Sequence, residues 1–263
     1  MGYGDFLMAL GEARSVHAAS GSRVVMAEGA HADYASLLAG HPYAVLPGAS
    51  NAGAGLPVID TRGRRPYIDY DHITAKRVRW KPYQPAPAEL VFSASQQASI
   101  AALRARLAPF VLVEPNIKDA KLLAENKDWG IRKYQQVVDT LGVRCVQPRY
   151  GRKLLDGVVQ VDTPRFLDAV LLLAAADAAL LPEGGLHHAA AAVGTPAVVI
   201  YGGVISPANT GYDLHLNQYA GGEPCGSRKP CRHCRQAMGA IGVPRVVADL
   251  RRLLAARGVA CTT

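Results

Sequence analysis

The chain has 263 residues, of which 49% are apolar, 19% charged and 6% aromatic. This composition is typical of a globular protein and excludes fibrous and disordered chains. The net charge of +8 leaves two interpretations open: a surface with surplus Lys and Arg, or an anionic partner such as nucleotide phosphates, a phosphorylated lipid or nucleic acid. Five cysteines are too few for a disulfide scaffold.

We expect no transmembrane segment. The longest apolar stretch, residues 166–181, contains Asp168 and Asp177 and is too short to cross a bilayer. The first residues, MGYGDFLMALGEARS, lack the basic and then apolar order of a signal peptide. We therefore expect a cytoplasmic protein, with peripheral association at the inner membrane as the alternative.

The first part of the chain has the pattern of a small α/β unit. We predict a helix followed by three short apolar strands, at residues 5–19, 22–29, 43–48 and 56–63. The next segment, residues 62–83, is basic and aromatic, and three prolines within residues 81–90 mark a linker. The sequence therefore predicts a small N-terminal lobe over residues 1–88 and a larger C-terminal lobe over residues 89–263.

After the linker, apolar strands alternate with helices. The predicted strands are 110–115, 143–148, 157–161, 178–182 and 196–202, and the predicted helices are 93–107, 132–142, 163–177 and 244–258. For the third of these helices we expect Thr163 as the N-cap and Pro164 in the first position. The alternation predicts an α/β fold with a parallel sheet covered by helices on both faces.

The stretch LLPEGGLHHAAAAVGTPAVVIYGG is a candidate anion site. Glu183, Gly184 and Gly185 follow a buried strand, where open α/β sheets bind their ligands. The glycines permit close approach to the backbone, and the N-terminus of the next helix favours a diphosphate. His187 and His188 are about 100° apart around that helix, so they face different surroundings. The alternative is a capping glycine pair with two packed histidines.

This stretch resembles the donor-binding segment of glycosyltransferase family 9, the ADP-heptose:lipopolysaccharide heptosyltransferases. The family segment reads Asp-Thr-Gly-Leu-x-His, then small residues, then Gly-x-Pro. Glu183, Gly184, Gly185 and His188 match its Asp, Thr, Gly and His. The resemblance implies that Glu183 and His188 contact the donor sugar and that the glycine backbone binds the diphosphate. Glu in place of Asp lengthens the reach, and Gly in place of Thr removes a hydroxyl.

A second segment, FVLVEPNIKDAKLLAENKDWG, resembles the strand, Pro-containing loop and Lys-x-Trp that open the donor lobe in this family. Lys127 and Trp129 match the Lys-x-Trp, and Lys127 is thereby expected to bind donor phosphate. Asn116, in the same loop, is included among the expected donor-binding residues. Lys118 and Lys121 compete with Lys127 for its role, and a solvated lysine remains the alternative.

A third segment, MGYGDFLMALGEAR, is similar to the opening of the family, where a Gly-Asp pair precedes a helix. Gly4 and Asp5 match that pair. The resemblance implies that Asp5 is the general base that deprotonates the acceptor hydroxyl. A helix-capping aspartate is the alternative. The strand that precedes the pair in the family has no counterpart before Asp5, so we expect a reduced N-terminal lobe.

Together the three segments imply a GT-B fold with two Rossmann-like lobes and parallel sheets. The implied activity is inverting transfer of a heptose-like or hexose sugar from a nucleotide-diphosphate sugar, bound by the C-terminal lobe, without a catalytic cofactor. The expected acceptor, on the N-terminal lobe, is lipopolysaccharide core or another anionic, hydroxyl-bearing molecule such as a protein or modified nucleic acid. One rival function is a nucleotide-sugar epimerase of the same fold. Another is a non-catalytic nucleic-acid-binding module that uses Arg64, Arg65, Lys76, Arg77, Arg79 and Trp80.

The segment CGSRKPCRHC places three cysteines close together, Cys225, Cys231 and Cys234. With His233 or His215 as a fourth ligand they would suit structural Zn or Fe. A structural metal, free or packed thiols, and a disulfide all remain open. The segment is also basic, and we name it as a candidate contact for an anionic acceptor or the donor phosphates on account of Arg228, Lys229, Arg232 and Arg235.

Overall fold

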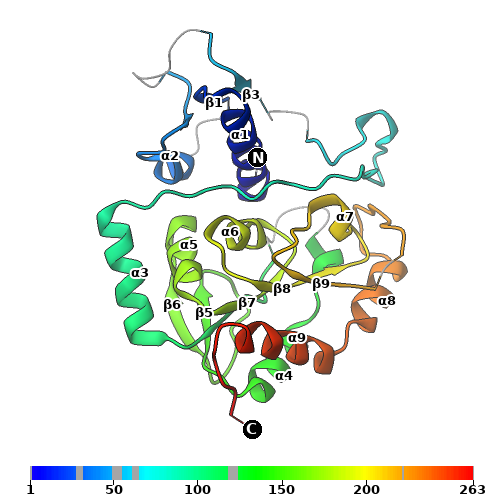
Figure 1. The fold of residues 1–263 in the computed structure, drawn as a ribbon. Helices are drawn as coiled ribbons and strands as arrows, with labels where there is room; N and C mark the ends of the chain where they lie inside the picture. The colour runs from blue at the N-terminus through cyan, green and yellow to red at the C-terminus, as the bar shows by residue number, and fades with distance from the viewer. Residues whose placement is uncertain are drawn as a thin grey trace.

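The computed structural model describes residues 2–27, 32–48, 55–60, 65–117, 124–220 and 222–262. The described chain forms two parallel sheets, one of three strands and one of six. The small sheet lies above the large one in Figure 1, and α1 (Tyr3–Ser20) lies between them. Among the residues that the structure describes, no helix is long and apolar enough to span a membrane.

The small sheet confirms the three short strands expected in the first part of the chain. It has the order β2-β1-β3 and consists of β1 (Val24–Met26), β2 (Ala44–Val45) and β3 (Val58–Ile59). The first helix, α1, packs on this sheet with buried apolar residues such as Phe6 and Leu10, and it ends at Gly21, whose φ is 69°. A shorter helix, α2 (Ala32–Leu38), follows β1.

The large sheet has six parallel strands in the order β6-β5-β4-β7-β8-β9. They are β4 (Val111–Val113), β5 (Cys145–Arg149), β6 (Val159–Asp162), β7 (Ala178–Pro182), β8 (Ala197–Gly202) and β9 (Leu216–Tyr219). β7 and β8 are buried along their whole lengths, because helices cover both faces of a parallel sheet. The strand order reverses between β4 and β7, and sheets of this kind bind ligands at such a point.

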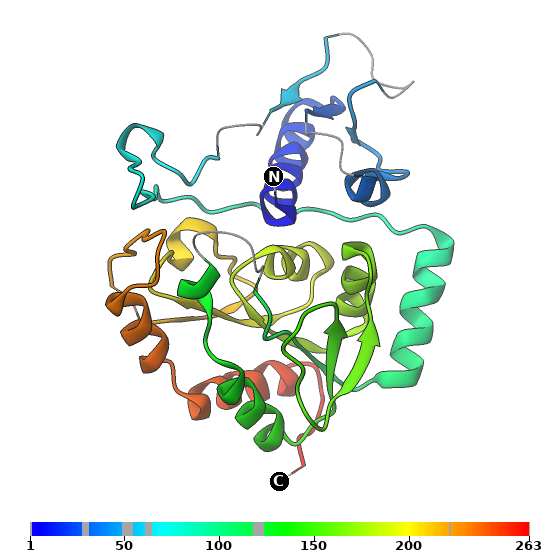
Figure 2. The ribbon, with the colours of Figure 1, turned by 180° about the vertical axis from the view of Figure 1, so that it is seen from behind.

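Helices cover both faces of the large sheet, as Figures 1 and 2 show. On the face toward α1 lie α3 (Ala94–Leu107), α5 (Phe166–Ala175) and α6 (Gly185–Val193). On the other face lie α4 (Ile131–Leu141), α8 (Arg232–Ala240) and α9 (Val243–Ala255). Three short helices complete the description: η1 (Tyr70–His72), η2 (Ala124–Lys127) and α7 (Pro207–Thr210).

The part of the chain that forms the small sheet meets the large sheet's helices where α1 crosses α6. Gly4 lies so close to α6 that a Cβ in its place would be 2.7 Å from Cδ2 of His188. Side chains of α1 and of the large sheet belong to one continuous apolar cluster. Residues 81–93, which have no regular secondary structure, run past α1 to α3, and the predicted boundary between residues 88 and 89 falls within them.

The start of α5 differs from the prediction. The helix begins at Phe166, and its N-cap is Arg165 rather than Thr163. The physical reason is the carboxylate of Asp168, whose Oδ2 accepts a hydrogen bond of 3.0 Å from the backbone N–H of Arg165. Thr163 and Pro164 are thereby left in the loop before the helix, and both line the cavity described below.

Candidate functional site

A cavity of about 1090 Å³ lies between α1 and the carboxyl ends of the large-sheet strands. This volume suits a ligand of the size of a nucleotide sugar. The cavity brings together residues that the sequence analysis drew from three distant segments, namely Asp5, Asn116, Lys127, Glu183, Gly184, Gly185 and His188. The expectation that these segments converge on one site is therefore met by the geometry.

Glu183 is a buried carboxylate held by two partners. It follows β7, its Oε2 pairs with Nζ of Lys127, and its Oε1 accepts a hydrogen bond of 3.3 Å from Thr210. Burial alone would raise the pKa of Glu183, but the positive charge of Lys127 and the two hydrogen bonds outweigh it, and the pKa lies below its ordinary value. Glu183 is therefore ionised, and Lys127 is directed into the cavity wall beside it.

The two histidines have different surroundings, as the helical spacing predicts. His187 is fully buried, and its Nε2–H donates to the carbonyl of Thr210 at 3.0 Å. Its Nδ1 lies 3.0 Å from the backbone nitrogen of Gly184 and 2.8 Å from the carbonyl oxygen of the same residue. His187 thus caps α6, and the N–H of Gly184 is already occupied.

His188 lines the cavity, next to Gly4. Its Nδ1 lies 2.8 Å from the hydroxyl of Tyr212, which fixes the ring. Burial lowers the pKa of His188 well below its ordinary value, with a further effect from His187, so the imidazole is neutral. A neutral, fixed ring with one edge on the cavity can hydrogen-bond a sugar hydroxyl.

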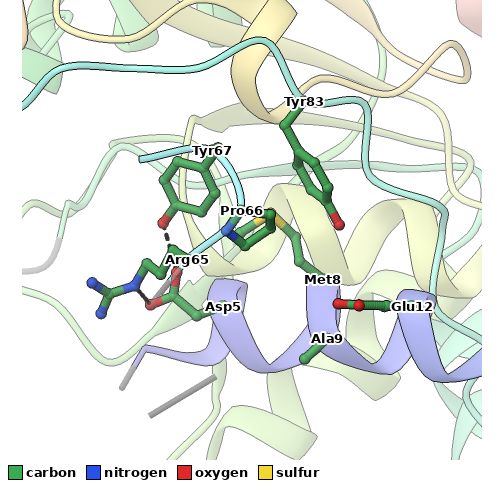
Figure 3. Close-up of a pocket in the computed structure, with 8 residues that line it drawn as sticks. All are labelled: Asp5, Met8, Ala9, Glu12, Arg65, Pro66, Tyr67 and Tyr83. Carbon is green, nitrogen blue, oxygen red and sulfur yellow. Dashed lines mark hydrogen bonds and ion pairs between the residues drawn. The ribbon is translucent and has the colours of Figure 1, made fainter. Parts of the chain in front are cut away.

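Asp5 lies in the first turn of α1, and side chains from a later loop hold both of its oxygens (Figure 3). The hydroxyl of Tyr67 donates to Oδ1 at 2.6 Å, and Nε of Arg65 lies 2.7 Å from Oδ2. The backbone N–H of Gly2 is a weaker third partner at 3.4 Å. The sequence analysis missed Arg65 and Tyr67 as partners of Asp5, because no local spacing relates residues so far apart in the chain.

Glu114 is a buried carboxylate that the sequence analysis also missed. It follows β4 and lines the cavity, and its Oε1 accepts a hydrogen bond of 2.5 Å from the backbone N–H of Asn116. Burial raises the pKa of Glu114 to about 7, against the opposing effect of the hydrogen bonds from Asn116. The hydroxyl of Tyr150 is a further hydrogen-bond partner of this carboxylate and also opposes the rise of its pKa. The sequence feature that could have identified Glu114 as a site residue is its position directly after an apolar strand.

Trp129 is not among the residues that line the cavity. Its indole is 4% exposed, packs edge-on against Tyr134 and donates to the carbonyl of Ile241 at 3.0 Å. The structure therefore places Trp129 in the core beneath α4, whereas Lys127 of the same motif reaches the cavity. Lys118 and Lys121, the competitors of Lys127, lie outside the described residues.

The three loop cysteines converge in front of α8. The sulfur of Cys225 lies 3.3 Å from that of Cys234 and 3.8 Å from that of Cys231. These separations exceed the roughly 2.05 Å of a disulfide bond, so that interpretation is wrong in this structure. His215 is not part of the group of mutually close ligand atoms at the cysteines, and its Nε2 lies 3.0 Å from the carbonyl oxygen of His187.

The cysteine cluster fits a tetrahedral metal. A metal with 2.3 Å bonds to sulfur places its thiolates roughly 3.8 Å apart, close to the separations found here. His233 would be the histidine ligand, because its ring nitrogen lies within 4.8 Å of the sulfurs of Cys225 and Cys234, and these three residues form a group that could hold an ion. Burial raises the pKa of Cys231, but the backbone N–H of Cys234 and neighbouring donors outweigh this and lower it overall. At Cys234 the pKa shifts the other way, because burial and the neighbouring thiols Cys225 and Cys231 raise it.

The basic segment proposed for nucleic-acid binding is only partly available. Lys76, Arg77 and Arg79 are exposed, but Arg65 is paired with Asp5. The indole N–H of Trp80 donates to the carbonyl of Val204 at 2.6 Å. Arg64 lies outside the described residues. None of the three exposed cations is among the residues that line the cavity.

Two parallel sheets with a cavity between α1 and the strand ends define a GT-B architecture. No protein-family model and no curated protein sequence matches the chain. Its fold is similar to that of the E. coli ADP-heptose lps heptosyltransferase II at 16% identity, with a TM-score of 0.60 over 98% of this chain and 97% of that one. It is also similar, at 16% identity and a TM-score of 0.61, to TibC from enterotoxigenic E. coli H10407, over 98% of this chain and 76% of that one.

TibC is described as a bacterial iron-containing dodecameric glycosyltransferase. A second TibC structure, a complex with ADP-D-beta-D-heptose, matches at 15% identity with a TM-score of 0.57, over 97% of this chain and 75% of that one. Likeness at this identity concerns the fold. The GT-B fold that the sequence resemblance implied is therefore confirmed, and the solved structures that share it are glycosyltransferases.

Proposed function

We propose that this chain is a glycosyltransferase that moves a sugar from a nucleoside-diphosphate sugar to a hydroxyl acceptor with inversion at the anomeric carbon. The observation that supports this proposal most directly is the cavity. Asp5 lines it from one proposed lobe, and Lys127, Glu183 and His188 line it from the other. A base, a phosphate-binding cation and sugar-binding groups are the parts that this reaction needs. We propose a reduced N-terminal lobe, residues 1–88, as the acceptor lobe and residues 89–263 as the donor lobe.

In the proposed reaction, Asp5 takes the proton from the acceptor hydroxyl. The acceptor oxygen bonds to the anomeric carbon while the bond from that carbon to the diphosphate breaks, and the electron pair leaves with the diphosphate. Attack from the face opposite the leaving group inverts the configuration. The hydrogen bonds from Tyr67 and Arg65 fix the orientation of the Asp5 carboxylate.

The diphosphate is proposed to lie against Lys127 and the N-terminus of α6. Since His187 already occupies the N–H of Gly184, the free backbone donors there begin with Gly185. Glu183 and His188 are proposed to hold the sugar hydroxyls. Binding of the donor requires Lys127 to be shared between the diphosphate and Glu183, with which it is paired in this structure.

The donor is proposed to be a heptose-like or hexose nucleotide, since the structural neighbours are described with ADP-heptose. The acceptor is proposed to be lipopolysaccharide core or another anionic molecule, in keeping with the net charge of +8 and the exposed cations Lys76, Arg77 and Arg79. Such a protein would act in the cytoplasm or at the inner face of the membrane. We propose that the cysteine cluster holds structural Fe or Zn and that catalysis needs no cofactor.

The test is a donor screen with the full-length protein. ADP-, UDP-, GDP- and CDP-sugars are compared by thermal shift, and the best binder is then assayed for transfer to lipopolysaccharide core. We expect one nucleotide to raise the melting temperature and to support turnover. Salt-sensitive binding to nucleic acid without a response to any nucleotide sugar would contradict the proposal. Conversion of the donor without an acceptor would identify the epimerase instead.

A further inference from the structure

A cation on the cavity wall has no role in the reaction described so far. Arg228 lies in the loop between Cys225 and Cys231, and its side chain lines the cavity. Its Nε is buried without a hydrogen-bond partner. Among the described residues Arg228 takes part in no ion pair, whereas the other lining cations pair with carboxylates: Arg65 with Asp5, Lys127 with Glu183 and Arg165 with Asp168.

An amide from η2 fixes one side of this loop. Asn126 is 3% exposed, and its Nδ2 donates to the carbonyls of Ser227 and Lys229 at 2.9 and 2.8 Å. Its Oδ1 accepts from the N–H of Cys231 at 3.2 Å. Because Asn126 directly precedes Lys127, the same side chain links the backbone that carries Lys127 to the loop that carries Arg228.

The basic segment fixes the other side of the loop. The N–H of Arg228 donates to the carbonyl of Lys76 at 3.0 Å, and the N–H of Val78 donates to the carbonyl of Gly226 at 2.8 Å. Gly226 has a φ of 58°, and a Cβ there would lie 1.7 Å from the carbonyl oxygen of Val78. The backbone of Arg228 is therefore held between η2 and the basic segment, with the cysteine cluster at both ends of its loop.

We propose that Arg228 is a second cation for the donor diphosphate, and that Asn126 and the cysteine cluster hold it in the cavity. This inference rests on the proposed function. Glu183 offsets the charge of Lys127, so Lys127 alone does not neutralise a diphosphate. A guanidinium binds phosphate oxygens through two parallel N–H groups, and a buried Nε without a partner is a donor open to such a ligand.

The experiment measures the affinity of the full-length protein by calorimetry for ADP, GDP, UDP and CDP, and for the nucleoside of the best binder. Arg228→Gln should weaken binding of the diphosphate about 10- to 100-fold, because a charge-assisted hydrogen bond is lost. Its affinity for the nucleoside should stay within about twofold. Arg228→Lys keeps the charge but not the paired N–H donors of the guanidinium. Its affinity for the diphosphate should lie between those of the wild type and Arg228→Gln. Arg245→Gln, at an exposed position of α9 away from the cavity, is the matched control and should bind as the wild type does.

The outcomes separate this inference from the function on which it rests. If the wild type binds a nucleoside diphosphate and Arg228→Gln binds it equally well, the inference is overturned and the proposed function stands. If Arg228→Gln lowers the affinities for nucleoside and diphosphate by the same factor, Arg228 only supports the fold and the inference is again overturned. If the wild type binds none of the four diphosphates, the proposed function fails and the inference falls with it.

The role proposed for Asn126, to hold the loop that carries Arg228, has its own test. Asn126→Ala removes the link between η2 and the loop. It should therefore lower the affinity for the diphosphate by a larger factor than the affinity for the nucleoside. Equal losses for the two ligands would show that Asn126 supports the fold only. Circular dichroism and the melting temperature establish that the variant is folded, and Ser227→Ala, which keeps the backbone carbonyl that Asn126 binds, serves as its control.

Discussion

The carboxylate of Asp5 takes its orientation from Tyr67 and Arg65, which hold one oxygen each. A carboxylate held in this way has little freedom left to lose, which suits the role of base proposed for Asp5. Glu183 is fixed in the same manner by Lys127 and Thr210. At the scale of single residues, then, charge pairing across the cavity sets the positions of the groups proposed to react.

Replacement of Asp5 tests the role of this carboxylate. Asp5→Asn keeps the size of the side chain but removes the basic oxygen, so we expect turnover to fall by roughly 10²- to 10⁴-fold. Donor affinity should stay within about twofold, because Lys127 and Glu183 are untouched. Steady-state transfer and calorimetry measure the two quantities. Glu12→Gln, on an exposed position of the same helix, is the control, and unimpaired turnover of Asp5→Asn would remove Asp5 as the base.

Glu114 predicts a pH dependence of stability. Its pKa is about 7 in the folded chain and about 4.5 when unfolded, so the folded state binds more protons between these values. The stabilisation that the protonated Glu114 contributes is fully present below pH 4.5 and is lost as the pH rises through 7. Glu114→Gln, which cannot ionise, should therefore become more stable relative to the wild type between pH 5 and 8, by up to about 3 kcal/mol.

Urea unfolding of both proteins at several pH values measures this difference. Glu125→Gln is the control, since Glu125 is exposed and should give no trend. A constant difference between wild type and Glu114→Gln across this pH range would contradict the assignment of the raised pKa to Glu114.

At the scale of elements, the periodicity of apolar residues predicted the strands and helices of both sheets and their alternation. It did not predict α2, β9 or α8. LNQY of β9 is half-polar, and the helix after Cys231 shows few apolar residues. The position of Glu183 followed from the rule that parallel sheets bind ligands at the carboxyl ends of their strands. The roles of Asp5 and Lys127 at the same site were implied by the family resemblance alone.

Contacts between distant side chains lay beyond the sequence. Tyr67 and Asp5 meet only because the loop after β3 folds back over α1. Trp129 was assigned to the donor together with Lys127, yet the indole reaches Ile241 in the core. A Lys-x-Trp motif specifies the residues but not the direction of each side chain, which depends on the backbone turn between η2 and α4.

The crossing of α1 and α6 makes a prediction about an element contact. In Gly4→Ala the new methyl would lie 2.7 Å from the ring of His188, which Tyr212 holds in place. Overpacking of this kind should outweigh the gain in helix propensity and destabilise the protein by about 1–2 kcal/mol. Displacement of the His188 ring should also weaken donor binding.

Urea unfolding and calorimetry test this pair of effects. Gly2→Ala is the matched control, since a Cβ at Gly2 would meet only Oδ2 of Asp5 at 3.8 Å, an ordinary contact. A Gly4→Ala variant as stable as the wild type would show that α1 moves freely on α6.

At the scale of the whole molecule, the loop of the cysteine cluster connects parts of both lobes. Asn126 links it to η2, and Lys76 and Val78 link it to the basic segment near α1. The loop lies on the same side of the molecule as that segment in both views (Figures 1 and 2). A metal bound by Cys225, Cys231, His233 and Cys234 would therefore stabilise the arrangement of the two lobes as well as its own loop.

Removal of that metal should lower the stability of the entire chain. Elemental analysis of the purified protein should find about one Fe or Zn per chain, and a chelator should lower the melting temperature by roughly 10 °C, because a ligand present well above its dissociation constant stabilises the folded state. Cys234→Ser should lose the metal and melt at the lower temperature with or without chelator. Cys261→Ser, in the C-terminal segment, should behave as the wild type. A metal-free wild type with an unchanged melting temperature would mean that packed thiols alone hold the lobes together.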